Sequence, residues 1–129
     1  MDTPTATPAT TGASAATDPD ALARLRRFGG DKLLREMIGL YLDAAPERIA
    51  AARSALETSD VMAAELALHS LKSSSAQLGA ARLSRLSDQG EIIARTGALD
   101  GIADIIGEME GELVRVQAWL AGVRDGGEQ

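Results

Sequence analysis

The chain has 129 residues, of which 45% are hydrophobic and only 2% aromatic, and its formal net charge is −6 at pH 7. The negative charge argues against binding to nucleic acid, which needs clustered Lys and Arg, and no apolar run approaches the ~18 residues of a membrane span. With no cysteine, the chain lacks disulfides and thiolate metal sites, which fits a reducing, cytoplasmic location. Ala and Leu without aromatic residues favour helices over strands.

The first residues, 1–17, are mostly Thr, Ala, Pro and Ser. Such a segment buries too little apolar surface to offset the entropy cost of ordering it, so we predict a disordered tail. A short helix should follow, because Asp18 can cap it and Pro19 suits its first turn. Gly29 and Gly30 can end this helix.

A second, longer helix is predicted within residues 31–60, where apolar side chains recur at spacings of three and four. These side chains are Leu34, Ile38, Tyr41, Ala45, Ile49, Ala52 and Leu56. Pro46 interrupts the segment, because it cannot donate a backbone hydrogen bond to the carbonyl of Leu42. We therefore expect a kink or break nearby.

The third and fourth helices are separated by a short glycine turn. Ser59 or Asp60 can cap the third helix, which should run to Leu78. The fourth helix covers residues 80–96 and should stop at Gly97.

The fifth helix starts near Leu99 and ends in a frayed segment, residues 123–129. Its apolar side chains are Ile102, Ile105, Met109, Leu113, Val116 and Leu120. Connections of two to four residues make successive long helices antiparallel neighbours. We therefore predict an all-α fold, an antiparallel four-helix bundle over residues 18–122 with a short extra N-terminal helix.

The only histidine of the chain, His69, lies on the third predicted helix. The core stripe of that helix is Val61, Ala64, Leu68, Leu71, Ser75 and Leu78. At 100° per residue, His69 lies roughly 130° from the centre of this stripe, so we expect it to point outward. Most exposed histidines on helices have no special role. Whether His69 has a function therefore has to be judged from the residues around it.

The neighbours of His69 on the outward face are apolar or small, where charged residues are expected. They are Met62, Leu66, Ser73 and Ala76. Exposed apolar surface of this kind is typical of a docking site for a partner protein. Lys72 lies one turn after His69, close enough to reach a group carried on the imidazole. The pattern favours a nucleophile within a shallow interface over a catalytic pocket.

The fourth predicted helix has a polar flank beside its apolar seam. The seam contains Leu83, Leu86, Gly90 and Ile93, and the flank contains Ser84, Asp88, Glu91 and Arg95. A charged flank is most often solvated surface. If it lies beside His69, however, Glu91 could accept the Nδ1 proton and leave the lone pair on Nε2.

Together these residues resemble the histidine-containing phosphotransfer (HPt) domain family. The resemblance covers roughly residues 20–122 and is sharpest in HSLKSSSAQLGA, which is similar to the family signature H-x-L-K-[G/S]-x-x-x-x-x-G-A. In EIIAR, Glu91 and Arg95 stand at the distances from His69 where the family has an acidic or amide residue and a basic one.

The resemblance implies that His69 accepts a phosphoryl group on Nε2 from a receiver-domain phosphoaspartate and passes it to another receiver. It implies that Lys72 screens the phosphoryl charge, Glu91 orients the imidazole and Arg95 lies on the adjoining surface. The implied partners are response-regulator receiver domains, with a hybrid sensor histidine kinase as a further candidate. No cofactor of its own is implied, because Mg²⁺ belongs to the receiver. We also expect no kinase activity, because the sequence has no nucleotide-binding motif and no room for a kinase catalytic domain.

Two positions depart from the family pattern. Ser73 adds a hydroxyl where the family often has glycine, which could narrow the set of partners. Gly90 stands where the family usually has a larger apolar residue, and the missing side chain could loosen the packing behind Glu91.

Other classes of protein fit this sequence less well. A di-iron bundle enzyme needs paired Glu-x-x-His motifs, which one histidine cannot supply, so we expect no metal site. The dimerisation domain of a sensor kinase pairs two-helix hairpins between chains, whereas four helices from one chain predict a monomer. A helical adaptor whose His69 is never phosphorylated stays an open alternative.

Overall fold

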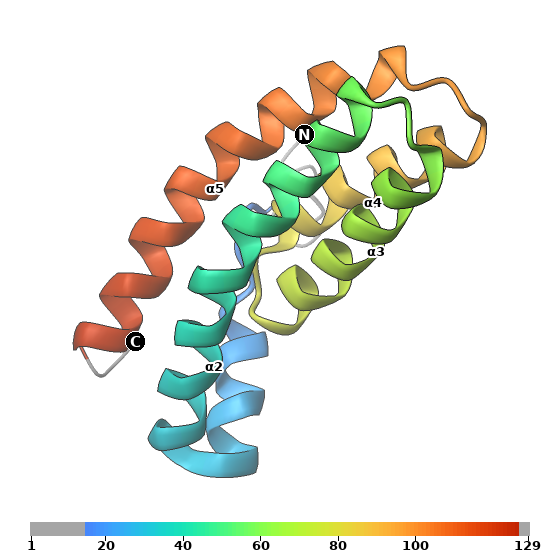
Figure 1. Ribbon diagram of the computed structural model, residues 1–129. Helices are drawn as coiled ribbons and strands as arrows, with labels where there is room; N and C mark the ends of the chain where they lie inside the picture. Colours follow the sequence, from blue (N-terminus) through green and yellow to red (C-terminus); the bar gives the residue numbers. More distant parts are fainter. Residues whose placement is uncertain (1–14, 127–129) are drawn as a thin grey trace, which may run out of the picture.

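The computed structural model describes residues 15–126, and within this range the secondary structure is helical throughout (Figure 1). The helices are α2 (Pro19–Glu57), α3 (Val61–Gln77), α4 (Ala81–Arg95) and α5 (Asp100–Gly126). Both α3 and α5 pack against α2 and α4, and successive long helices run in opposite directions (Figure 1). The predicted all-α antiparallel four-helix bundle is therefore confirmed. None of the described helices is both long and apolar enough to cross a bilayer.

The predicted short N-terminal helix is the first part of α2. Asp18 caps it, since the backbone N–H of Asp20 donates to the Asp18 carboxylate over 3.1 Å. Gly30 has non-helical backbone angles, φ 75° and ψ −175°, and the chain folds back there (Figure 1). Glycine adopts this positive φ without the steric cost that a Cβ would add. Gly30 thus separates the short helix from the long second part of α2.

The break expected near Pro46 is absent. The backbone angles of α2 stay helical from Gly30 to its end, with Pro46 inside. Tyr41, Ala45 and Ile49 lie on the buried face around it and are at most 3% exposed. Packing of this face keeps the helix continuous through the position where one backbone hydrogen bond is missing.

The core follows the predicted stripes closely. Its largest fully buried apolar side chains are Leu34, Ile38, Leu68, Leu71, Leu78, Leu83, Ile102, Ile106, Met109, Val116 and Leu120. In α5, Ile106 is fully buried, whereas Ile105, which was predicted for this face, only packs against the core edge. Buried polar groups in the core have partners. Tyr41 and Ser75 share a hydrogen bond of 2.7 Å, and Glu112 accepts one from Arg115 over 3.0 Å.

The two ends of the bundle differ from the prediction. Residues 1–14 of the predicted tail lie outside the described range, but the following segment is bonded to α4, because the Arg82 N–H donates to the Ala16 carbonyl over 3.0 Å. At the other end, α5 continues to Gly126 and buries Val123, which extends the apolar stripe. The prediction of a frayed end from residue 123 is thus wrong for residues 123–126, which are helical. Residues 127–129 lie outside the described range.

Candidate functional site

His69 lies on α3 and points away from the core. Its neighbours Leu68 and Leu71 are fully buried, while the His69 side chain is 58% exposed. This is the outward direction that the helical spacing predicted. The imidazole is therefore accessible to another protein.

Glu91 of α4 holds one side of this imidazole. The His69 Nδ1 lies 2.9 Å from the Glu91 Oε2. An ionised carboxylate can only accept hydrogen bonds, so this contact places the proton of the neutral ring on Nδ1 and leaves the lone pair on Nε2. The pairing that the sequence left conditional is thus present.

Glu91 is far more buried than a charged residue on a helix flank usually is. Glu91 is only 2% exposed, because α4 turns the face that carries it towards α3. Gly90 permits this approach, since a Cβ there would lie 3.0 Å from the Leu68 Cδ1. The missing side chain at Gly90 therefore does not loosen the packing, because Leu68 already fills that space.

Two cations also meet the Glu91 carboxylate. Arg95 donates to Oε2 over 2.8 Å, and the Lys72 Nζ lies 2.9 Å from Oε1. This second contact is an ion pair outside good hydrogen-bond geometry. Burial alone would raise the pKa of Glu91, but Lys72 and His69 outweigh it and lower the pKa below its usual value of 4.5. Glu91 is thus ionised at neutral pH.

Lys72 is shared between two carboxylates of α4. Besides its contact with Glu91, its Nζ lies 3.3 Å from the Asp88 Oδ1, and these two partners raise the pKa of Lys72. The Ser84 hydroxyl donates to the Lys72 carbonyl over 3.0 Å, which ties α4 to α3 at this point. Lys72 is held one turn from His69 with its charge fixed.

Arg95 is bonded within the site as well as exposed on the surface beside it. Its Nε donates to the Glu65 Oε2 over 3.0 Å. Neither Glu65 nor Asp88 was predicted to take part in the site. One signal was available for Glu65: it stands four residues before His69, and positions four apart share a helix face. The sequence does not show which flank of α4 faces α3, so it could not predict the role of Asp88.

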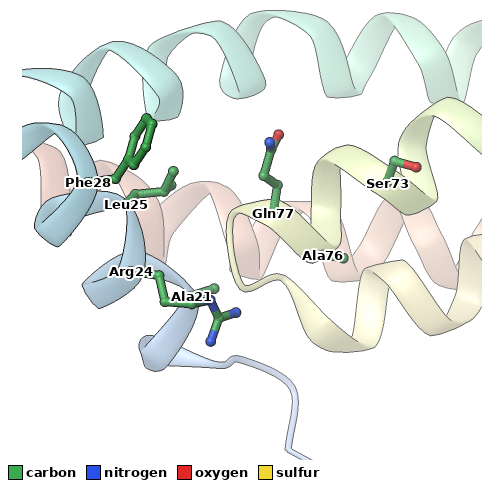
Figure 2. A pocket seen from close by; sticks show the side chains of 7 residues that line it. All are labelled: Ala21, Arg24, Leu25, Phe28, Ser73, Ala76 and Gln77. Carbon is green, nitrogen blue, oxygen red and sulfur yellow. The ribbon is translucent and has the colours of Figure 1, made fainter.

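The apolar residues predicted around His69 are exposed but lie in two different hollows. Met62 and Leu66, 81% and 68% exposed, line a hollow of about 750 Å³ together with His69. Ser73 and Ala76 are also exposed but line a second hollow between α3 and the short N-terminal helix (Figure 2). Within residues 15–126, no group of three or more His, Cys, Asp or Glu side chains is placed to hold a metal ion.

The comparisons with known proteins agree with one another. Residues 36–119 match the family described as Hpt domain. The structure is similar to histidine-containing phosphotransfer protein B (HptB) from Pseudomonas aeruginosa PAO1, with a TM-score of 0.81 and 26% identity over 85% of this chain and 95% of that chain. It also resembles the HPT domain of an Hpt sensor hybrid histidine kinase from Shewanella in fold, with a TM-score of 0.70 and 20% identity over 86% and 95% of the two chains. Sequence comparison with curated proteins gives no match.

Proposed function

The chain belongs to the Hpt domain family of phosphorelay phosphotransfer proteins, which are intermediates and not kinases, and we propose that His69 is its phosphoacceptor. His69 takes the phosphoryl group from the phosphoaspartate of one receiver domain and passes it to another. One observation carries this proposal: the imidazole is 58% exposed, yet its Nδ1 is held 2.9 Å from the buried carboxylate of Glu91.

The transfer needs little equipment from this chain. The Nε2 lone pair of His69 attacks the phosphorus, an N–P bond forms, the acyl-phosphate O–P bond breaks, and the aspartate leaves as a carboxylate. No proton has to be removed first, because Nδ1 carries it. The ring becomes cationic on phosphorylation, and the anionic Glu91 offsets this charge.

We assign to Lys72 the screening of the phosphoryl oxygens. Of the two ion pairs of Lys72, the contact with Asp88 is the longer and weaker one, at 3.3 Å. A phosphoryl group on His69 would therefore replace Asp88, and not Glu91, as a partner of the Lys72 ammonium. The catalytic Mg²⁺ belongs to the receiver, and this chain contributes no cofactor. In-line phosphoryl transfer depends on positioning and charge neutralisation, which these residues supply.

Receiver docking would use the exposed face around His69. Met62 and Leu66 supply apolar surface on one side of the imidazole, and Arg95, 53% exposed, adds a cation next to it. Ser73 and Ala76 continue the face towards the C-terminal end of α3. The small side chains at these two positions allow a partner backbone to approach closely.

The first prediction tests the phosphoacceptor. Incubation with a receiver domain that has been phosphorylated by acetyl phosphate should label the wild-type chain, and acid should remove the label, because phosphohistidine is acid-labile whereas phosphoserine is stable. His69→Gln should lose essentially all label, since the amide has no nucleophilic lone pair on nitrogen. The matched control is Ser70→Ala, which should keep it.

Label that survives in His69→Gln, or that resists acid, would contradict the assignment of His69. A wild-type chain that takes no label from any receiver of its source organism would favour the adaptor alternative. Circular dichroism of each variant separates loss of the acceptor from loss of the fold.

A further inference from the structure

The hollow beside the short N-terminal helix contains the most exposed large apolar side chain in the described part of the chain. Phe28 is 88% exposed. It lines a hollow of about 570 Å³ together with Leu25 of the same helix and with Ser73, Ala76 and Gln77 of α3. Figure 2 shows Leu25 projecting from the short helix towards Gln77. Two helices that are distant in sequence thus form one apolar concavity.

This hollow is continuous with the face that carries His69. Ser73 and Ala76 stand four and seven residues after His69 on α3, so they share its side of the helix. At 1.5 Å per residue, Ala76 lies only about 10 Å along the axis from His69. The hollow is therefore part of the surface that a protein docked over His69 would meet.

The area of an ordinary interface supports the same conclusion. A specific protein–protein contact buries about 800 Å² on each partner, which corresponds to a patch about 16 Å in radius. Centred on His69, such a patch extends beyond Ala76 at one end and beyond Met62 at the other, because each lies about 10 Å along the helix axis. The hollow around Met62 and Leu66 lies on the Met62 side of His69, so residues near Ala76 have to supply the other side.

The charge of the short helix points to an acidic partner. Residues 19–29 carry three basic side chains (Arg24, Arg26, Arg27) and one acidic one (Asp20), a net charge of +2 in a chain of net charge −6. Arg26 pairs with Asp31 at 2.7 Å, while Arg24 lines the hollow. A receiver face that holds Mg²⁺ is acidic, because Mg²⁺ is bound through carboxylates.

We infer that Phe28 is a second anchor for the receiver domain, and that the hollow between Phe28 and Ala76 accepts an apolar side chain of that receiver. The inference rests on the proposed function. Aromatic side chains, Phe among them, are enriched in protein–protein interfaces relative to the rest of the surface. The turn at Gly30, with φ 75°, brings the end of the short helix to this position, so Phe28 would set receiver affinity without touching the reacting atoms.

The test compares Phe28→Ala with a matched control on another face. Val114 is 65% exposed on α5, which packs against α2 and α4, so Val114→Ala removes exposed apolar surface away from α3. The probe is an isolated receiver domain, phosphorylated by acetyl phosphate, that labels the wild-type chain. The initial transfer rate is measured against receiver concentration.

Phe28→Ala should raise the receiver concentration for half-maximal rate at least about tenfold, the range of a hot spot, and leave the maximal rate within about twofold. Phe28→Leu should raise this concentration less, because leucine keeps apolar surface at the position. Val114→Ala should leave the half-maximal concentration unchanged. Circular dichroism should show the same helix content in all variants.

Unchanged half-maximal concentration in Phe28→Ala, an equal change in Val114→Ala, or a loss confined to the maximal rate would overturn the inference and leave the phosphoacceptor assignment intact. A wild-type chain that takes no label from any receiver would overturn both. The two failures are therefore distinguishable in one set of reactions.

Discussion

Glu91 is the residue on which the proposed chemistry depends most after His69. It is a buried carboxylate that meets the imidazole and two cations, and these contacts keep it ionised against the effect of burial. Because an ionised carboxylate only accepts, it fixes the ring proton on Nδ1. Glu91 is thus a positioning residue, which acts on the phosphoryl group through His69.

Glu91→Ala should lower the maximal rate of phosphotransfer about tenfold or more, because the imidazole loses the group that sets its tautomer and orientation. Glu91→Gln should restore the rate to within a few-fold of wild type, since its amide oxygen can still accept from Nδ1. The measurement is single-turnover transfer at saturating receiver. Equal rates in Glu91→Ala and wild type, or no recovery in Glu91→Gln, would show that Glu91 does not orient the ring.

The sequence predicted the orientation of His69 but not the burial of Glu91. Helical periodicity gives the direction of His69, because the direction is measured against the apolar stripe of its own helix. It does not give the burial of Glu91. A glutamate on a helix is rarely buried unless it is paired, and its partners, His69 and Lys72, come from a different helix. Only the packing of α4 against α3 brings them together.

At the scale of elements, the corner between α3 and α4 keeps the site in register. Gly79 has a φ of +78°, and a Cβ there would collide with the carbonyl oxygen of Asp18. The same corner accepts a hydrogen bond of 2.7 Å from the Asp18 N–H to the Gly79 carbonyl. The start of α2 is thereby tied to the turn between the two helices that carry the site.

Gly79→Ala should lower the free energy of unfolding by about 1–3 kcal/mol, because a non-glycine residue is strained at positive φ and its Cβ has no space. The matched control is Gly107→Ala in α5, where nothing lies within 4 Å of the added Cβ. That variant should raise the free energy of unfolding by up to about 1 kcal/mol, since alanine favours helix. Urea denaturation measures both, and a Gly79→Ala variant as stable as wild type would contradict the strain.

Helix boundaries were predictable where a local signal decides them, and not where packing does. Gly30 separates the two parts of α2 because the backbone angles that it adopts are costly for other residues. Pro46 gave an equally local signal, but buried neighbours on the same face outweigh the one hydrogen bond that it removes. The end of α5 was placed too early for a related reason: the contribution of Val123 comes from its partners in the core.

In the whole molecule, the four long helices close a core within one chain. Each packs against two neighbours, and fully buried Leu, Ile, Val and Met side chains fill the core between them. The all-α bundle was predictable because each helix has its own apolar stripe and the connections are short. The position of the short N-terminal helix beside α3 was not predictable, since this position depends on the direction of the chain after Gly30. That position adds Phe28 to the surface near His69.

A core that is complete within one chain predicts a monomer. The mass in solution, measured by sedimentation equilibrium, should be close to the 13.4 kDa of one chain and should not change on about tenfold dilution, because association would have to bury additional apolar surface of the size of a stable interface. Apart from Phe28, Met62 and Leu66, which we assign to receiver docking, the exposed large apolar side chains of the described residues are Leu40, Ile92 and Val114. A sensor-kinase dimerisation domain, by contrast, completes its bundle only from two chains. An obligate dimer whose helix content is lost on dissociation would therefore contradict the monomeric bundle and favour that alternative.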